Sequence, residues 1–580
     1  MPISARMKKK QWKIMPPDDR ADTIATHLNI SQLTAQLLIN RGICSTEDAV
    51  VFLNPKLKDL IPPDQMPGVT KAIPRIKKAI QTAQKITIFG DYDTDGISGV
   101  SIIWQILKLL GADVDYYIPH RSEEGYGLNA DAICSLSEGG TKLLITVDCG
   151  ATAGETAQLA SKLGIDLIIT DHHRLESTLP KAFAIVHPGL EPSYGNQESS
   201  GSMVAFKLAW AIANEFNNGP RLEPRLRDFM INATSLAAVG TIADIMDLRG
   251  ENRILTSFGL KTLADCELVG VKALIETAGL TGQGLDSFHI GFRLGPMLNA
   301  AGRMGHARLA VELLTSDSEI RAVQIAEYLK EQNTLRRQCE QKIFKHACAM
   351  INESGLNHPD RKTIVIAEDS WHKGVIGIVA SRIVDRYYKP TIILNTEAET
   401  AQGSARSIAG FDILDAICSC SSHLNDFGGH KMAAGVRLQR DKIESFAFAF
   451  EEYAKVNLNE DDFIDKLSID AQTQLSNIRM DTVIELKRLE PFGQGNPRPI
   501  FVTKGVRLAA APRRVGAKGS HLQLSVTDNT AAIRCIGFGM GPLEKKFLEN
   551  EFFNVVYEAD INTFNGSSNV QLVLADVQFD

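Results

Sequence analysis

A short apolar run followed by three carboxylates is the feature that most constrains the fold. Residues 85–90 (KITIFG) are apolar and β-branched over a length that suits a buried strand. Asp91, Asp93 and Asp95 follow on alternate residues, and the apolar segment 100–110 after the next glycines predicts a helix. A strand, an acidic turn and a helix begin an α/β unit, in which ligands bind at the carboxyl ends of the strands.

Carboxylates crowded at one strand end repel one another unless a cation offsets their charge. The alternative is an acidic solvated loop in which Asp is a turn former. The next predicted strands favour a metal site, because they too end in carboxylates or imidazoles: 142–147 before Asp148, 165–170 before Asp171-His172-His173, and 182–186 before His187. Strands that alternate with helices predict a parallel, doubly wound sheet, at whose edge these side chains would gather.

The strand-end residues and one acidic residue of a later helical segment form a candidate metal site: Asp93, Asp95, Asp148, His172 and Asp244. A carboxylate-rich set with an imidazole suits Mn²⁺ or Mg²⁺ better than a thiolate-type metal site does. Two such ions bridged by a carboxylate can activate a water and hold a phosphate for in-line attack. The sequence therefore predicts a two-metal centre that works on phosphate esters.

Composition leaves the partner open. The 580 residues are expected to form three or four domains, and the net charge of -7 does not exclude nucleic acid, because binding needs only a local basic groove. Nine scattered cysteines fit reduced thiols, and no apolar run is long enough to predict a membrane span. The basic start, with Lys8, Lys9 and Lys10, lacks an apolar stretch, so we expect no secretory signal and a cytoplasmic protein.

The order of patterns along the chain predicts five parts. Residues 1–80 are expected to form a helical lead-in, with helical spacing over 21–41 and 46–53 and an N-cap at Ser45 or Thr46. A long helix is predicted within 316–355, because the stretch from about Asp317 to Ser354 contains no Pro or Gly. The expected parts are the lead-in 1–80, an α/β block 81–315, the connecting helix 316–355, a second α/β block 356–456 and a β-rich segment 457–580.

Two Gly-rich segments and the final β-rich segment carry candidate nucleic-acid contacts. We expect Gly-rich loops at 403–407 and 428–435, where backbone amides and the side chains of Arg406 and His430 would suit a phosphate, although each could be an ordinary turn. Gly302 and Arg303 are expected in a Gly/Asn-rich loop. The final segment predicts a small closed barrel of the OB type, a common binder of single strands, with a basic loop that holds Arg513, Arg514 and Lys518.

Several motifs together resemble a known family. Residues 91–96 (DYDTDG), 147–150 (VDCG), 171–173 (DHH) and 243–244 (AD) resemble the four motifs of the DHH phosphoesterase superfamily, and 403–407 with 428–435 resemble its DHHA1 domain. Residues 40–43 (NRGI), 124–128 (EGYGL), 299–304 (NAAGRM) and 489–497 (LEPFGQGNP) are similar to the RecJ family of single-strand-specific exonucleases. The resemblance covers the chain from about residue 30 to its end. It implies a parallel-sheet DHH catalytic domain, a long helix, a smaller α/β DHHA1 domain and an OB-type barrel.

The resemblance also implies roles for single residues. Asp148 would bridge two Mn²⁺ or Mg²⁺ ions, with Asp93 on one ion and Asp95, His172 and Asp244 on the other. Asp171 would orient its neighbour and His173 would face the scissile phosphate. Phe89 stands where smaller DHH enzymes place a metal-binding His, which predicts weaker binding of one ion. The implied nucleic-acid contacts are Arg121, Tyr126, Arg303, Ser404, Arg406 and His430.

The function that the resemblance implies is 5′-to-3′ digestion of single-stranded DNA in recombination and repair. It implies a monomer that acts with a single-strand-binding protein and a helicase and not at a membrane. One alternative is a DHH phosphodiesterase for short oligoribonucleotides or cyclic dinucleotides, but those proteins resemble only the two α/β blocks. The other is an inactive DNA-binding scaffold, but such proteins lose ligands that are all present here.

Overall fold

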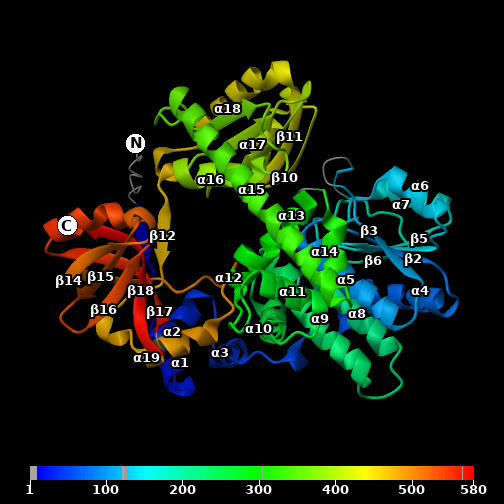
Figure 1. Cartoon of the computed structure of the whole chain (residues 1–580), viewed down its shortest axis with the longest axis horizontal. Helices are drawn as coiled ribbons and strands as arrows, with labels where there is room; N and C mark the ends of the chain where they lie inside the picture. The colour runs from blue at the N-terminus through cyan, green and yellow to red at the C-terminus, as the bar shows by residue number, and fades with distance from the viewer. Residues whose placement is uncertain (1–9, 121–123, 126, 304, 565, 580) are drawn as a thin grey trace. The chain divides into compact units, whose positions relative to one another are not determined.

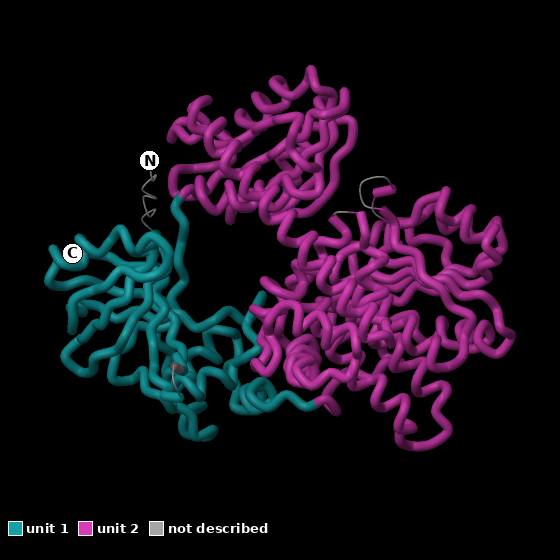
Figure 2. The backbone as a smooth tube through the Cα atoms, in the orientation of Figure 1, with its two compact units in different colours: residues 1–56, 464–580 teal, residues 57–463 magenta. Residues whose placement is uncertain are grey.

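The computed structural model describes residues 10–120, 124–125, 127–303, 305–564 and 566–579. These residues divide into two compact units, which Figure 2 distinguishes by colour. Unit 1 contains the segment up to Lys56 together with the segment from Ile464 onward, and unit 2 is the continuous stretch Leu57–Phe463. The first helices of the chain therefore fold with its last strands.

Unit 2 begins with the predicted parallel sheet, whose strand order is β3-β2-β4-β5-β6 (Figure 1). Alternate residues of its strands face different cores: Ile88 and Ile145 pack with one set of helices, Phe89 and Leu144 with another. Both faces of the sheet are thus covered, which is why the strands are apolar throughout. The strands are β2 (Ile86–Gly90), β3 (Val114–Tyr117), β4 (Leu143–Val147), β5 (Asp166–Thr170) and β6 (Ala184–Val186).

Helices complete the first α/β block. On one face α5 packs against both α8 and α9, and α9 in turn packs against α10. The segment with Gly302 and Arg303, expected as a loop, is instead helical, because it forms the end of α13 (Gly295–Arg303). The helices are α4 (Val69–Gln81), α5 (Thr94–Leu109), α6 (Ala130–Glu138), α7 (Gly154–Lys162), α8 (Gly201–Glu215), α9 (Pro224–Ala243), α10 (Gly250–Ala264), α11 (Val269–Thr277), α13 and α14 (Ala307–Leu314).

The predicted long helix is α15, which runs for 35 residues from Glu319 to Glu353. It leads into a second sheet of order β10-β11-β9-β8-β7, in which only β7 and β8 are parallel. The expectation of Gly-rich loops was wrong, because residues 403–406 lie in β9 and residues 428–430 and 433–435 lie in β10 and β11. The elements are β7 (Ile364–Glu368), α16 (Ile376–Tyr387), β8 (Thr391–Asn395), β9 (Thr400–Arg406), α17 (Ile413–Ser419), β10 (Asp426–His430), β11 (Ala433–Gln439) and α18 (Ile443–Asn457).

Unit 1 is the predicted closed barrel with the first helices packed on it. The barrel closes because β14 pairs with both β15 and β17. One core contains Leu37 and Leu38 of the lead-in together with Phe501 and Phe553 of the barrel. The elements are β1 (Gln11–Ile14), α1 (Arg20–Leu28), α2 (Gln32–Asn40), α3 (Thr46–Leu53), β12 (Lys466–Ile469), β13 (Ala471–Gln472), α19 (Met480–Leu486), β14 (Phe501–Val515), β15 (His521–Thr527), β16 (Ala532–Gly537), α20 (Glu544–Glu549), β17 (Phe553–Phe564) and β18 (Ser567–Phe579).

Two local expectations for this unit differ from the structure. The helical pattern over 21–41 is two helices, because Asn29 is left-handed at the end of α1 and Ser31 caps α2. Arg513 and Arg514 lie in β14 and not in a loop, while Lys518 does lie in the turn before β15. The helix 46–53 with Ser45 as its N-cap is confirmed, since the Ser45 hydroxyl accepts a hydrogen bond from the Asp48 amide.

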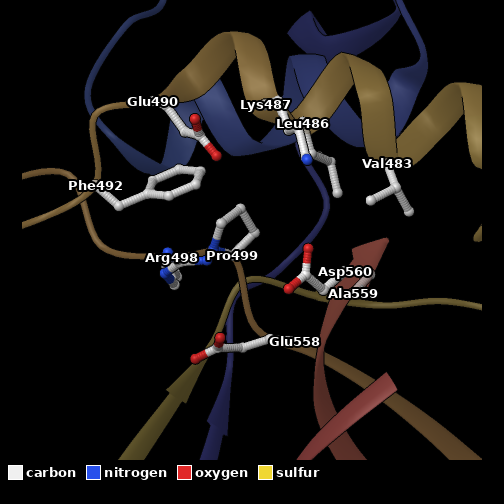
Figure 3. A pocket seen from close by; sticks show the side chains of 10 residues that line it. All are labelled: Val483, Leu486, Lys487, Glu490, Phe492, Arg498, Pro499, Glu558, Ala559 and Asp560. Carbon is white, nitrogen blue, oxygen red and sulfur yellow. The ribbon is translucent and has the colours of Figure 1, made fainter. Parts of the chain in front are cut away.

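Figure 3 shows a small cavity of unit 1 between α19 and β17. Its volume is about 30 Å³, which is room for about one water and not for a nucleotide. At the edge of this cavity, the guanidinium of Arg498 lies 5.5 Å from the centre of the Phe492 ring.

Among the described residues, no helix is both long enough and apolar enough to cross a membrane.

Candidate metal centre and nucleic-acid cleft

The acidic turn after β2 and the turns after β4 and β5 lie side by side, because these strands are neighbours in the sheet. The backbone of Asp148 is left-handed (φ 62°), a conformation that Asp tolerates better than most residues, and its side chain is buried. His172, from the turn after β5, places its Nε2 atom 3.1 Å from Oδ1 of Asp148. The same atom lies 3.5 Å from Oδ2 of Asp244 and 4.0 Å from Oδ2 of Asp95.

Backbone amides hold the carboxylates of the first turn. Asp93 is the N-cap of α5, and its Oδ1 accepts hydrogen bonds from the amides of Asp95 and Gly96. The carboxylate of Asp95 is held in turn by the beginning of α8, where the amides of Gly201 and Ser202 donate to its two oxygens at 2.6 and 3.0 Å. Both carboxylates are therefore fixed before any ion arrives.

Asp171 organises the two histidines that follow it. Its buried carboxylate accepts hydrogen bonds from the amides of Ala151, His172 and His173 and from Nδ1 of His173 at 2.8 Å. Burial alone would raise the pKa of Asp171, but these hydrogen bonds, above all that from the His173 ring, lower it to about 2. Burial opposes protonation of His173, yet its bond to Asp171 raises its pKa to about 9. This raised pKa favours the protonated His173 ring at neutral pH in the metal-free protein.

Asp93, Asp148 and Asp244 have the opposite pKa shift. Burial and then repulsion by Asp95 raise the pKa of both Asp93 and Asp148. The same causes raise the pKa of Asp244 to about 8. Groups whose ionised forms are this costly need a positive charge between them.

The donor set fits divalent cations. Three groups of side chains place one ligand atom each within 4.8 Å of the others: Asp148 with His172 and His173, Asp95 with His172 and Asp244, and Asp91 with Asp93 and Asp148. All five predicted ligands are in these groups, and Asp148 is in two of them. Oxygen-rich sets with an imidazole suit Mn²⁺ or Mg²⁺.

Asp91 was given no ligand role from the sequence, although its place in the run of alternate carboxylates was the signal that could have assigned one. Asp91 is 5% exposed, and its carboxylate lies within 4.8 Å of those of Asp93 and Asp148, with which it forms the third of these groups. Phe89 is buried and stacks on Tyr117 with ring centroids 5.3 Å apart, so it offers no ligand.

Two adjoining cavities extend from this centre. One of about 320 Å³ is lined by Asp91, Asp93 and His173 of the centre and by Tyr92 and Arg303. The other, of about 790 Å³, is also lined by Tyr92 and Arg303 and continues to the second sheet. Arg303 stands where they meet, and its Nη1 donates to the Gly374 carbonyl at 2.9 Å.

The second sheet presents a glycine-rich face to the larger cavity. Ser404 of β9 lies opposite Gly435 of β11, which lies opposite Gly428 of β10. Two glycines without side chains leave open space over this part of the sheet, and all three residues line the cavity. Arg406 and His430 lie in a neighbouring row, each opposite Ala433, so a cation and an imidazole share one end of this face.

Arg406 and Ser404 also meet the beginning of α16. A Cβ atom at Gly377 would lie 3.2 Å from both Nη2 of Arg406 and Oγ of Ser404. The amino end of a helix beside an arginine and a hydroxyl group favours anions.

The two adjoining cavities together form a cleft, and some residues of its walls were not found from the sequence. Trp371, His372 and Lys373 follow β7 and line the larger cavity, as does Arg437 of β11. The first three could have been found as another strand end, whereas nothing in the sequence singles out Arg437.

The remaining expected contacts lie outside the described residues or belong to unit 1. Arg121 and Tyr126 lie outside the described residues. In unit 1, Arg513 donates a hydrogen bond to the side chain of Gln523, and Arg514 donates one to the carboxylate of Glu544. Lys518 has a left-handed backbone (φ 57°) in the turn between β14 and β15.

Three family models match successive parts of the chain. The model of the DHH family, N-terminal domain, matches residues 85–234, that of the DHHA1 domain matches 360–456, and that of the RecJ OB domain matches 469–576. Fold and site together thus define a DHH-family protein with an added OB domain.

The relatives narrow this class to one family. The single-stranded-DNA-specific exonuclease RecJ of Bacillus subtilis is 38% identical over 98% of this chain and 71% of its own. That of Escherichia coli is 31% identical over 97% of each chain. The crystal structure of RecJ from Thermus thermophilus in complex with Mn²⁺ superposes with a TM-score of 0.83, at 28% identity, over 98% of this chain and 80% of that one. The chain belongs to the RecJ family.

Proposed function

We propose that this protein is a metal-dependent exonuclease specific for single-stranded DNA, and that it digests the strand in the 5′-to-3′ direction. The observation that carries the proposal is the carboxylate–histidine centre, from which two adjoining cavities lead to the strand face that holds Ser404 and Gly435. Arg406 and His430 lie in the next row of that sheet. Family membership supports the single-stranded substrate, since the curated relatives are named as exonucleases of that specificity. The polarity rests on the family resemblance.

We assign the metal ligands by position. Asp148 would bridge two ions, Asp93 would hold one, and Asp95, His172 and Asp244 would hold the other; Asp91 is an added candidate beside Asp93. RecJ of Thermus thermophilus has been crystallised with Mn²⁺ and with Mg²⁺, which supports either ion here. When bound, the ions would supply an activated water and neutralise charge on the scissile phosphate.

The protein's own side chains bind and orient the strand. His173 is held by Asp171, and in its protonated form, which the raised pKa favours, it would donate a hydrogen bond to a phosphate oxygen next to the carboxylates. Arg303, Ser404, Arg406 and His430 would hold backbone phosphates along the cleft, and Arg121 and Tyr126 would grip the strand and stack on it. Arg513, Arg514 and Lys518 would capture the strand on the barrel. Contacts to phosphates position the strand without reading its sequence.

The wider role is also a proposal. We infer that the protein works in recombination and repair in the cytoplasm as a monomer, together with a single-strand-binding protein and a helicase. We retain the five-part division at residues 80, 315, 355 and 456 as a description of functional parts. The family-model matches over 85–234, 360–456 and 469–576 are compatible with it.

One experiment tests the activity and its alternatives. Oligonucleotides labelled at either end are incubated with the protein and Mn²⁺, Mg²⁺ or EDTA. We expect the 5′ label to be released as a mononucleotide, only from single strands and only when a metal ion is present. Hydrolysis confined to di- and trinucleotides or to cyclic dinucleotides would favour the small phosphodiesterases, and strand binding without hydrolysis would favour the scaffold.

A further inference from the structure

Two phenylalanines of unit 2 are exposed and stacked on each other. Phe288 is 52% exposed and Phe292 is 62% exposed. Their ring centroids lie 4.7 Å apart and their planes are inclined by 25°. Single exposed rings are ordinary on soluble proteins, but apolar side chains that adjoin one another at the surface mark interaction sites.

The backbone holds this aromatic pair rigidly. Phe288 lies in α12 (Ser287–His289) and Phe292 in the π-helical segment η4 (Ile290–Leu294) that continues α12. Ile290 and Leu294 of the same segment are buried, so its other side is fixed in the core. Short π-helical segments are rare and are frequent at functional sites.

The segment that carries the pair leads into residues that contact the neighbours of the metal ligands. Segment η4 leads directly into α13, whose Gly295 carbonyl accepts a hydrogen bond from the Thr94 hydroxyl at 3.1 Å. A Cβ atom at Gly295 would lie 3.5 Å from Cβ of Ala243, the residue before Asp244. Phe292 precedes Gly295 by three residues, which is about 5 Å along a helix. Both η4 and α13 contact α9, which ends at Ala243.

Arginines lie beside the segment that carries the pair, and a third exposed apolar side chain follows the ligand Asp244. Arg337 of α15 donates from Nη2 to the Phe292 carbonyl at 3.3 Å, and Arg293 donates to the Ala278 carbonyl. Ile245 directly follows Asp244, is 71% exposed and has a left-handed backbone (φ 59°), which is strained for a β-branched residue. Exposed rings with arginines beside them suit a chain of bases linked by phosphates.

We propose that Phe288 and Phe292 form a stacking platform for bases of the single strand that enters the metal centre. This proposal rests on the proposed function, since it names how that site takes its substrate. Every base has a flat face, so the platform would accept all sequences, and it would bind bases that a duplex keeps stacked within itself. It would thus favour single strands without contacting the scissile phosphate.

The test compares strands with and without bases. The double variant Phe288→Ala/Phe292→Ala is assayed with Mn²⁺ on a labelled oligothymidylate of about 20 nucleotides, long enough to reach beyond one strand-binding site. A fully abasic strand of equal length is used as a competitor. Phe292→Trp and Phe292→Leu separate stacking from simple apolar contact. Phe448→Ala is the matched control, because Phe448 is 69% exposed on α18 of the same unit. The Mn²⁺-induced rise in melting temperature monitors the metal centre in every variant.

The platform predicts a KM for the oligothymidylate that is about tenfold higher in the double variant and in Phe292→Leu, since one stacked base is worth about that factor. Phe292→Trp should keep the wild-type KM, and so should the control Phe448→Ala. The inhibition constant of the abasic strand and the response to Mn²⁺ should be the same in all variants as in the wild type. An unchanged KM in the double variant would overturn the platform, as would an equal loss for the abasic strand or full activity of Phe292→Leu. If instead the wild-type protein digested no strand at all, the proposed function itself would fail.

Discussion

The amide of Gly201 donates a 2.6 Å hydrogen bond to Oδ2 of Asp95 while its Cα atom faces Asp148. A Cβ atom at this position would lie 2.5 Å from Oδ1 of Asp148, closer than atoms can approach without displacement. One glycine at the beginning of α8 therefore holds the carboxylate of Asp95 and leaves room for that of Asp148. Only a residue without a side chain can do both.

Gly201→Ala should accordingly weaken metal binding before it affects the fold. The added methyl group displaces Asp148 or α8, and changes to groups that support metal ligands cost about 10- to 100-fold in metal affinity. Titration of the melting temperature with Mn²⁺ measures this loss, and activity should return at high Mn²⁺. Gly154→Ala, at the start of α7 with no atom within 4 Å of the new Cβ, should behave as wild type. Equal Mn²⁺ affinity in the two variants would contradict the role of Gly201.

Asp148→Asn should abolish cleavage and stabilise the metal-free protein. Burial and neighbouring carboxylates raise the pKa of Asp148, so its ionised form destabilises the fold at neutral pH when no cation is present. An amide of the same shape removes that cost, and one pKa unit corresponds to about 1.4 kcal/mol. Thermal unfolding in EDTA should show a higher melting temperature than the wild type, with the Mn²⁺ response lost. Asp64→Asn, at an exposed site, should change neither quantity. Near-normal cleavage by Asp148→Asn would refute the bridging role.

The sequence predicts the centre well where local pattern decides position. Apolar runs that end in Asp148 and in Asp171-His172-His173 predict strands, and the structure has β4 and β5 there. Because parallel strands end at one edge, the meeting of these side chains follows from the fold class.

Other features depend on contacts between distant segments. The glycines at 403, 428 and 435 suggest loops by their local preference, but pairing of β9, β10 and β11 places them in strands. The missing side chains at Gly428 and Gly435 open the cleft, whereas a Cβ atom at Gly403 would lie 2.4 Å from the Leu394 side chain. The support of Asp95 by Gly201 joins residues that are 106 positions apart, and no local pattern announces it. The packing of α1–α3 on the barrel is of the same kind.

Arg406→Ala should weaken binding of all single strands by a similar factor. Arg406 lies beside the beginning of α16 and in one row with His430, a setting that suits phosphates and not base edges. Loss of one phosphate contact should lower the slope of log affinity against log salt by about 1. Binding isotherms for oligonucleotides of different sequence at several salt concentrations measure both effects. Arg440→Ala, an exposed change in the same domain, is the control. A loss that varied with sequence, or an unaltered salt slope, would assign Arg406 another role.

Specificity for single strands should be a property of unit 2. Removing the barrel alone, from about Asn457 onward, would expose Leu37 and Leu38, which are buried in the core that α2 shares with the barrel strands. The informative variant is therefore unit 2 by itself, residues 57–463, which retains the carboxylate centre, Arg303 and the cleft. It should cleave very short oligonucleotides at a rate close to that of the full chain. Its affinity for long strands and its processivity should fall, because Arg513, Arg514 and Lys518 are gone.

Blunt duplex should remain a poor substrate for both proteins, since a narrow cleft admits one strand whose bases are unpaired. Gel assays with matched single-stranded and duplex substrates measure this preference, and circular dichroism with the Mn²⁺ melting shift shows whether unit 2 is folded. If the folded unit digested blunt duplex efficiently, the barrel and not the cleft would exclude duplex. Should it lose cleavage of trinucleotides while still binding Mn²⁺, the barrel would be needed for the reaction itself. Retained short-substrate cleavage with weaker binding of long strands would assign strandedness to unit 2 and strand capture to unit 1.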